Sequence, residues 1–366
     1  MERSGSGRRK KLKEYFVNAM IFLFSALICF AIFECLIRII YKGNVVLFPR
    51  YHTDAAYGEY TIRRLRPNLE FWHTSIDGSW KFTTNSQGFR SDLDFSYDKP
   101  DGMLRIICLG DSQTQGFEVR QECTYSSVIE KYLCNHGYES EVFNTGISGF
   151  STAEELVFLE NEGINYKPDF VVLGFCANDF DDNIKAGLFE LNDGRLIVKK
   201  KEHIPGVRIL NVIYKIPFTR YLGENSHFYS LLFNSVWEYF KKQLHSQQEA
   251  QLLTESAVPS GELTDYKIEI TVRLIKRMYA FCQKNYITFV ILDIPRLDFR
   301  PSIPDEVRRI IINNCDIFVK GEEVLEDYKK VVEIHKPHGH RHISEFTHCL
   351  LGVRIAKEII AKGDNL

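Results

Sequence analysis

Four short segments of the chain carry residue types that could perform chemistry together. In chain order they are "GDS" (110–112), "NTGISG" (144–149), "FCAND" (175–179) and "HISEFTH" (342–348). The first supplies a serine, Ser112, and the last supplies a histidine, His342. A serine with a histidine base and nearby hydrogen-bond donors is the set that nucleophilic acyl transfer needs.

Each residue has a distinct role in that chemistry. Ser112 would attack the carbonyl carbon after His342 takes its proton. Three donors would stabilise the negative oxygen that forms: the backbone N–H of Ser112 at a helix start, the N–H of Gly149, and the side-chain amide of Asn178. A glycine suits the second position because a side chain would obstruct the substrate.

Taken singly, these residues also have ordinary structural interpretations. Ser112 alone would more often be a helix cap than a nucleophile, and Asn178 would more often be a turn residue. Asp181 and Asp182 are expected to be a solvated charge pair rather than an acid/base couple. The order of the segments, rather than any one residue, therefore favours catalysis.

The histidine-rich stretch allows more than one assignment. His340 or His338 is an alternative base if the register is shifted. His335, His338, His340 and His342 could instead bind a metal, although no carboxylate or cysteine stands at matching spacing. No metal or cofactor is therefore expected, and His335 and His348 are expected to be solvated.

The elements that must position these residues alternate along the chain. Apolar runs that predict buried strands cover 104–110, 141–147, 169–179 and 286–295. Helical patterns cover 124–137, 151–163, 266–285 and 350–363, the second with a capping box at Ser151–Glu154 or Thr152–Glu155. This alternation predicts an α/β protein with a parallel sheet covered by helices on both faces. The candidate residues follow the strand ends, where such sheets bind ligands.

The N-terminal segment has the properties of a membrane anchor. Residues 16–40 are apolar over the length of a spanning helix and follow the basic cluster "RRKKLK" (8–13). The excess of positive charge before the segment predicts a cytoplasmic N-terminus and an external remainder. A cleaved signal peptide and a buried core helix are the alternatives, but no small-residue cleavage motif ends the run.

Composition and pattern together suggest how the chain is organised. Its 366 residues, 45% hydrophobic, can form a large core, and a net charge of −2 gives no reason to expect a nucleic-acid partner. The nine cysteines include no CxxC pair, so neither a disulfide framework nor a zinc finger is indicated. The expected parts are a basic tail (1–15), an anchor (16–41), a β-rich linker or accessory region (42–103) and a catalytic domain (104–366) with an insertion at about 184–262.

In these segments the chain resembles the SGNH (GDSL) hydrolase superfamily of esterases and acylhydrolases. The four segments match the family's serine, glycine, asparagine and histidine blocks, and "TTNSQGFRS" (83–91) with the anchor resembles bacterial membrane-attached members. The resemblance implies a flavodoxin-like three-layer α/β/α sandwich. It departs from the family at Gly339, where members usually carry the aspartate that orients the histidine.

The function that the resemblance implies is a membrane-anchored, extracytoplasmic serine esterase, periplasmic in a bacterium. It would cleave an acyl or acetyl ester through an acyl-serine, with an ester-bearing small molecule, lipid or acylated glycan as substrate. Two alternatives remain open. One is an O-acyltransferase acting on a glycan, and the other is a non-catalytic SGNH-like module that binds a glycan or a partner.

Overall fold

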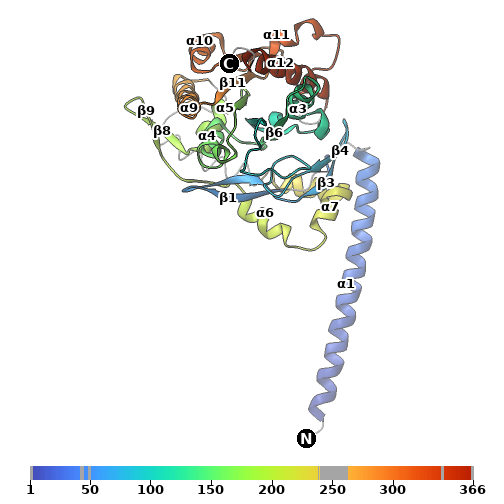
Figure 1. The fold of residues 1–366 in the computed structure, drawn as a ribbon. Helices are drawn as coiled ribbons and strands as arrows, with labels where there is room; N and C mark the ends of the chain where they lie inside the picture. Colours follow the sequence, from blue (N-terminus) through green and yellow to red (C-terminus); the bar gives the residue numbers. More distant parts are fainter. Residues whose placement is uncertain are drawn as a thin grey trace.

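A five-stranded parallel sheet forms the centre of the protein in a computed structural model (Figure 1). The structure describes residues 3–41, 45–47, 51–237, 239, 263–338 and 342–363. The strands of the sheet are β5 (Leu104–Gly110), β6 (Ser140–Asn144), β7 (Phe170–Phe175), β11 (Thr288–Asp293) and β12 (Ile317–Lys320). Their order, β12-β11-β7-β5-β6, is the flavodoxin-like arrangement.

Helices cover both faces of this sheet. Along β5, Ile106 and Cys108 pack on one face and Ile107 and Leu109 on the other. The long covering helices are α3 (Tyr125–Asn135) and α12 (Glu345–Gly363) on the first face, and α4 (Thr152–Asn161) and α9 (Asp265–Lys284) on the second. The predicted three-layer α/β/α fold is therefore confirmed, because period-2 alternation buries both faces of each strand.

Short elements connect these layers. The α-helices among them are α2 (Ser112–Gln115), α5 (Asp179–Ala186), α10 (Asp305–Ile311) and α11 (Gly321–Val324). The 3₁₀ turns are η1 (Gln121–Cys123), η2 (Gly163–Tyr166), η3 (Ile312–Asn314) and η4 (Glu326–Tyr328). β12 was not predicted from the sequence, and it is an edge strand of four residues in which only Val319 is buried.

Two β-hairpins precede the sheet. They are β1 (His52–Tyr57) with β2 (Tyr60–Leu65), and β3 (Glu70–Ser75) with β4 (Gly78–Thr83). β10 (Glu202–His203) adds to β2 in parallel, so the first hairpin and the later insertion share a three-stranded sheet, whereas β3 and β4 form a separate sheet.

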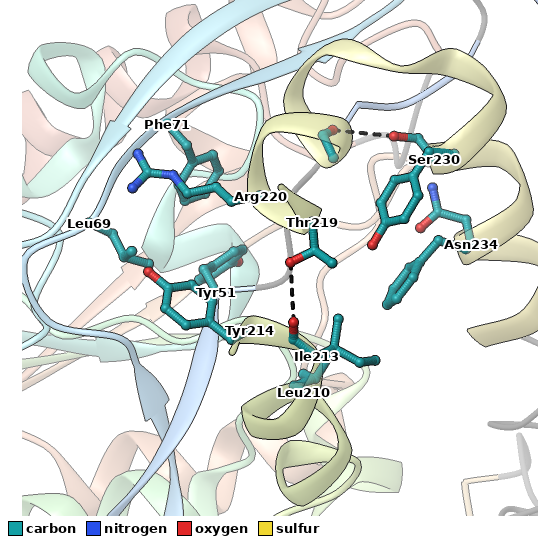
Figure 2. Close-up of a pocket in the computed structure, with 13 residues that line it drawn as sticks. Tyr51, Leu69, Phe71, Leu210, Ile213, Tyr214, Thr219, Arg220, Ser230 and Asn234 are labelled. Carbon is teal, nitrogen blue, oxygen red and sulfur yellow. Dashed lines mark hydrogen bonds between the residues drawn. The ribbon is translucent and has the colours of Figure 1, made fainter. Parts of the chain in front are cut away.

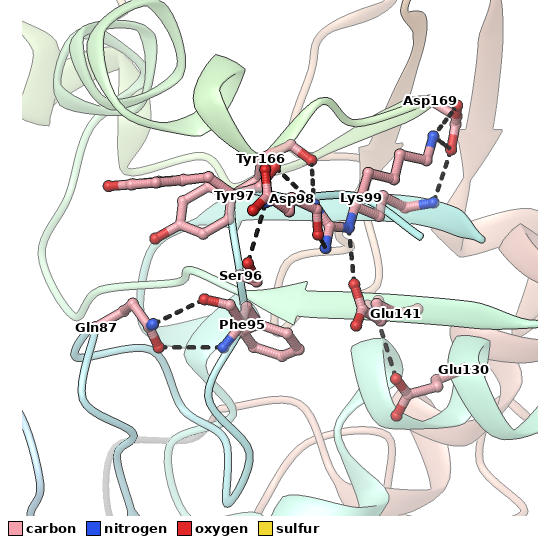
Figure 3. Close-up of polar contacts among 12 residues, drawn as sticks. Gln87, Phe95, Ser96, Tyr97, Asp98, Lys99, Glu130, Glu141, Tyr166 and Asp169 are labelled. Carbon is pink, nitrogen blue, oxygen red and sulfur yellow. Dashed lines mark hydrogen bonds and ion pairs between the residues drawn. The ribbon is translucent and has the colours of Figure 1, made fainter. Parts of the chain in front are cut away.

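Buried charges attach the segment after the hairpins to the central sheet. Arg105 on β5 is almost fully buried, pairs with Glu141 at 2.7 Å and donates to the carbonyl oxygens of Asp98 and Tyr166. The Lys99 ammonium pairs with Asp169 at 2.5 Å (Figure 3). The buried Arg105 charge must keep its partners, so its contacts, together with the more exposed Lys99–Asp169 pair, fix how residues 97–99 lie on the domain.

The insertion packs below the hairpins. Its elements include β8 (Phe189–Asn192), β9 (Arg195–Val198), α6 (Val207–Tyr214), α7 (Thr219–Asn225) and a helical stretch at 227–237. The part of the predicted insertion at 240–262 lies outside the described residues.

The N-terminal helix α1 (Arg3–Tyr41) projects from the body of the molecule (Figure 1). Residues Lys11–Tyr41 are long and apolar enough to cross a membrane, and none of the most apolar window is buried in the protein. The helix begins inside the expected tail at 1–15, so the basic cluster continues the same helix. Near its end, α1 contacts the body through Phe30, Phe33, Glu34 and Arg38.

Candidate active site

Ser112 stands on a tight turn at the carboxyl end of β5. Gly110 ends that strand with φ 152°, and a Cβ there would lie 1.9 Å from Thr114 Oγ1, so only glycine fits. The Asp111 carboxylate then accepts the Gln113 N–H at 2.8 Å and caps α2. Ser112 is therefore the first residue of α2, and it remains partly exposed.

His342 reaches this serine from the start of the final helical segment. Its Nε2 lies 2.7 Å from Ser112 Oγ. The backbone around His342 is held on both sides, because the Ile343 N–H donates to Gln113 Oε1 and the Lys336 N–H donates to the His342 carbonyl oxygen. The Phe117 ring packs 4.9 Å from the imidazole. Gln113 thus anchors the histidine segment to the nucleophile's own helix.

The other histidines lie in different environments. The alternative base His340, with Gly339 and Arg341, lies outside the described residues. His338 lies near the Asp77 carboxylate, with 2.9 Å between its Nδ1 and Asp77 Oδ1. Among the described residues there is no group of three or more histidines, cysteines or acids that could hold a metal ion.

The expectation that His335 and His348 are solvated is wrong. His348 is buried and its Nδ1 accepts the Tyr125 N–H at 3.1 Å. Burial lowers the pKa of His348 to about 3. His335 is largely buried as well, with its Nε2 3.2 Å from the Pro295 carbonyl oxygen. Both side chains fasten the histidine segment to the core, which sequence spacing alone did not reveal.

The glycine block is attached to the nucleophile's turn. Gly149 is exposed with φ 79°, in the loop between β6 and α4. The preceding Ser148 N–H donates to Gln115 Oε1 at 2.6 Å, and the Asn144 amide donates to the Thr114 carbonyl oxygen at 3.0 Å. These bonds hold the Gly149 loop beside the turn that carries Ser112.

Two arginines that sequence reasoning missed hold the same loops. Arg63 of β2 donates to the Gly149 carbonyl oxygen. Arg90 is fully buried, donates to the carbonyl oxygens of Gln115, Gly116 and Val119, and has its pKa lowered to about 10 by burial. The hairpin region thus contributes directly to the site. Nothing in the sequence pattern paired these arginines with their distant carbonyl acceptors.

Asn178 lies beside the nucleophile, and its side-chain amide already has two acceptors. Its Nδ2 donates to Asp111 Oδ2 at 3.0 Å and to Asp182 Oδ2 at 2.9 Å. Asp182 also accepts from Lys185 Nζ, whereas Asp181 pairs with the buried Lys267 ammonium at 2.6 Å. The expectation that Asp181 and Asp182 form a solvated charge pair is therefore wrong.

Three buried acids lie close enough behind the nucleophile to influence one another. Burial, reinforced by neighbouring negative charge, raises the pKa of Asp111 to about 6 and raises the pKa values of Glu155 and Asp179 well above their usual range. Asp179 accepts the Cys176 N–H at 2.8 Å. Neither carboxylate oxygen of Glu155 has a hydrogen-bond partner among the described residues. Glu155 therefore favours its protonated form in the folded protein.

Replacing Glu155 with glutamine should stabilise the protein at alkaline pH. The pKa of Glu155 is higher in the folded protein than in the unfolded chain. The contribution of Glu155 to stability is therefore complete below its unfolded-state pKa and is lost as the pH rises through its folded-state pKa. Glutamine keeps the shape without ionising, so the Glu155→Gln thermal midpoint should match the wild type near pH 4 to 5. Toward pH 9 it should exceed the wild type by on the order of a few degrees, measured by calorimetry.

The neighbouring Glu154 provides a control of opposite sign. Burial raises its pKa, but the His203 ring, which lies 2.9 Å from its carboxylate, and Arg63 outweigh burial and lower the pKa overall. The stabilisation from Glu154 is present above the unfolded pKa, so Glu154→Gln should destabilise the protein at pH 7. Equal effects of Glu155→Gln at pH 5 and pH 9 would contradict this account.

A separate cavity of about 40 Å³ lies under α6 and α7 and contains none of the candidate catalytic residues (Figure 2). Tyr51, Leu69 and Phe71 line it on the hairpin side, and Leu210, Ile213 and Tyr214 line it from α6. The Thr219 hydroxyl donates to the Ile213 carbonyl oxygen across the turn between the two helices. Tyr51 also accepts a hydrogen bond from Gln115 Nε2 at 2.7 Å, so one ring contacts both the cavity and the nucleophile's turn.

Comparisons with known proteins find similarity over part of the chain. Residues 108–245 match the family model described as the GDSL-like Lipase/Acylhydrolase family. An arylesterase from Vibrio mimicus is 32% identical over 75 residues, which cover 20% of this chain. The alignment spans 38% of the length of that arylesterase.

Solved structures of esterases are also similar at low sequence identity. A lipase/acylhydrolase from Enterococcus faecalis is 16% identical, with a TM-score of 0.38, and the match covers 71% of this chain and 97% of that chain. A catalytic mutant of an acetylxylan esterase from Geobacillus stearothermophilus is 12% identical, with a TM-score of 0.39, covering 70% and 94%. Because both TM-scores are below 0.5, we assign no chemistry from either structure.

The protein thus has an α/β fold in which His342 Nε2 lies within hydrogen-bond distance of Ser112 Oγ. The family match includes the serine, glycine and asparagine segments that indicated the resemblance, whereas the histidine segment at 342–348 lies outside the matched residues. Over residues 108–245, the chain is similar to the GDSL-like lipases and acylhydrolases.

Proposed function

We propose that the protein is a membrane-anchored, extracytoplasmic serine esterase that cleaves an acyl or acetyl ester through an acyl-serine intermediate. The observation that carries the proposal is the 2.7 Å contact between His342 Nε2 and Ser112 Oγ. A histidine within hydrogen-bond reach of a serine at a strand-to-helix turn is the arrangement that activates a hydroxyl nucleophile. The substrate would be an ester-bearing small molecule, a lipid or an acylated glycan.

In the first half-reaction His342 takes the proton as Ser112 Oγ attacks the carbonyl carbon. The backbone N–H groups of Ser112 and Gly149 and the amide of Asn178 stabilise the oxyanion. The intermediate collapses, the alcohol leaves with the proton from His342, and the acyl group stays on Oγ. Water then attacks the acyl-serine with His342 as base, which releases the carboxylic acid and restores Ser112.

Contacts at the end of α1 support an anchor that stays attached. The Glu34 carboxylate accepts hydrogen bonds from the Ser226 hydroxyl and from the N–H groups of His227 and Phe228. These groups begin the helical stretch 227–237, so Glu34 acts as its cap. A signal sequence removed after export would take this cap away, so the contacts favour a retained anchor. The basic residues before the apolar run favour a cytoplasmic N-terminus.

The proposal is tested by labelling the full chain in membranes with a fluorophosphonate probe. We expect covalent labelling at Ser112, identified by mass spectrometry, together with release of acetate from p-nitrophenyl acetate. A C-terminal alkaline phosphatase fusion should be active, because that reporter works only outside the cytoplasm. A chain that neither labels nor cleaves acetyl esters would instead be a binding module.

Adding an acylated donor and a polysaccharide acceptor separates hydrolysis from O-acyl transfer. Both reactions share the acyl-serine, and they differ in whether water or a sugar hydroxyl receives the acyl group. Acetate as the main product supports the esterase. Acetylated polysaccharide as the main product would identify an acyltransferase.

Replacing Asp182 with alanine should raise kcat. Both N–H bonds of the Asn178 amide point to carboxylates, so one bond must be released before the amide can donate to an oxyanion. Asp182 is the more exposed partner, whereas Asp111 is buried and caps α2. The variant should gain about 2- to 10-fold in kcat, the factor that corresponds to the net value of one hydrogen bond.

The adjacent acid provides the matched control for this variant. Asp181 pairs with Lys267 rather than with Asn178, so Asp181→Ala should leave kcat for p-nitrophenyl acetate unchanged. Asn178→Ala should lower kcat by about 10²- to 10³-fold, as expected for loss of an oxyanion donor. A fall in kcat in Asp182→Ala would show that Asp182 positions the amide instead of competing for it.

A further inference from the structure

The helices α6 and α7 carry apolar side chains on the side that faces away from the protein. Val207 and Leu210 of α6 are buried against the hairpins, as an amphipathic helix requires. The opposite side and the following turn nevertheless expose five large apolar residues: Ile209, Val212, Ile216, Phe218 and Tyr221. We call these five residues the platform surface. Val212 is 63% exposed and Phe218 is 79% exposed.

A helix that is apolar on both sides needs a second non-aqueous environment. Single exposed apolar residues are normal, but a contiguous patch of this kind marks a binding surface. Arg208, Lys215 and Arg220 are exposed in the same segment. Large apolar side chains with basic residues beside them are the composition of a segment that lies in a membrane interface.

The position of α1 indicates that the environment of the platform surface is a lipid bilayer. Phe30 and Phe33, in the apolar part of α1, pack on Phe228 with ring centroids 5.4 and 5.1 Å apart. Arg38 Nη2 donates to the Asn225 carbonyl oxygen at the end of α7. The insertion is therefore held against the spanning helix near the edge of its apolar run. In Figure 1, α6 and α7 form the side of the body toward which α1 extends.

We infer that the platform surface lies in the lipid headgroup region of the same bilayer that α1 crosses. This inference rests on the proposed membrane anchor. The apolar side chains enter the boundary between headgroups and acyl chains, and Lys215 reaches anionic headgroups, whereas Arg208 pairs with Glu202 and Arg220 with Glu224. The body is then held at two places and keeps one orientation on the membrane.

Fluorescence quenching by brominated lipids tests the inference on the full chain. The Phe218→Trp variant is reconstituted in phosphatidylcholine–phosphatidylglycerol vesicles whose acyl chains carry bromine. The emission of the three native tryptophans, measured on the wild-type protein, is subtracted. We expect bromine to lower the added emission at least twofold. The matched control is Tyr286→Trp, at a residue that is 96% exposed and outside the platform surface, whose added emission should not change.

A carbonate wash of the same vesicles separates failure of the anchor from failure of the platform surface. A chain that resists the wash but shows no quenching in Phe218→Trp overturns the inference and leaves the anchor standing. A chain removed by the wash overturns both. A third outcome would assign the platform surface to contact with a second copy of the chain and would also overturn the inference. In that case the added tryptophan is protected from aqueous iodide, bromine does not quench it, and the chain can be cross-linked as a dimer.

Discussion

Replacing Ser112 with alanine should lower kcat for acetyl ester hydrolysis by at least about 10⁴-fold. The serine Oγ is the atom that contacts the candidate base, at 2.7 Å from His342 Nε2. Alanine removes the nucleophile, whereas the backbone N–H groups and Asn178 remain to bind the substrate. KM should therefore change much less than kcat, and fluorophosphonate labelling should disappear. Steady-state kinetics on p-nitrophenyl acetate and gel fluorescence measure these two effects.

The nearest informative control is the other serine of the site. Ser148 lies in the glycine loop and uses its backbone N–H, which alanine retains, to contact Gln115. Ser148→Ala should keep kcat within about twofold, since the hydrogen bond that positions the loop survives. If Ser112→Ala kept a tenth of the wild-type activity at an unchanged thermal midpoint, Ser112 would not be the nucleophile.

Replacing His342 with alanine should have a comparable effect. Without a base, the serine hydroxyl stays protonated and attacks slowly, so kcat should fall by about 10⁴-fold or more. The Ser112/His342 double variant should be no worse than either single variant, because the two groups act as one unit. Activity assays on all three variants measure this lack of additivity.

The adjacent histidine positions test the register. His340→Ala should retain most of the activity, because Nε2 of His342 already contacts the nucleophile. His348→Ala should instead lower the thermal midpoint, because the buried imidazole accepts the Tyr125 N–H. Loss of activity in His340→Ala with retention in His342→Ala would move the base two residues earlier in the chain.

The sequence predicted the sheet and the order of the candidate residues, because those follow from local patterns. β5 and β7 are continuous apolar runs, and a parallel sheet brings their carboxyl ends to one edge. The structure accordingly brings Asn178 to Asp111 and His342 to Ser112. The short edge strand β12 has no comparable pattern, because three of its four residues are only partly buried.

The supporting contacts could not be predicted, because they join residues far apart in the chain through side-chain geometry. Arg63 reaches the Gly149 loop across 86 positions. The burial of His348 depends on how α12 packs on α3, which spacing does not report. The two acceptors of Asn178 likewise depend on where α5 starts relative to β5. The sequence shows which residues can donate or accept hydrogen bonds, but it does not show which of them bond to one another.

The Glu34 cap also determines the order in which the protein can be assembled. The Glu34 carboxylate lies 192 residues before Ser226, whose hydroxyl it binds, so it is synthesised earlier. The stretch 227–237 therefore completes its first turn on a group that is already present when this stretch is made. A chain without α1 would lose this cap and would also lose the ring contacts of Phe30 and Phe33 with Phe228. The N-terminal helix is therefore a structural part of the body as well as the segment proposed to anchor it.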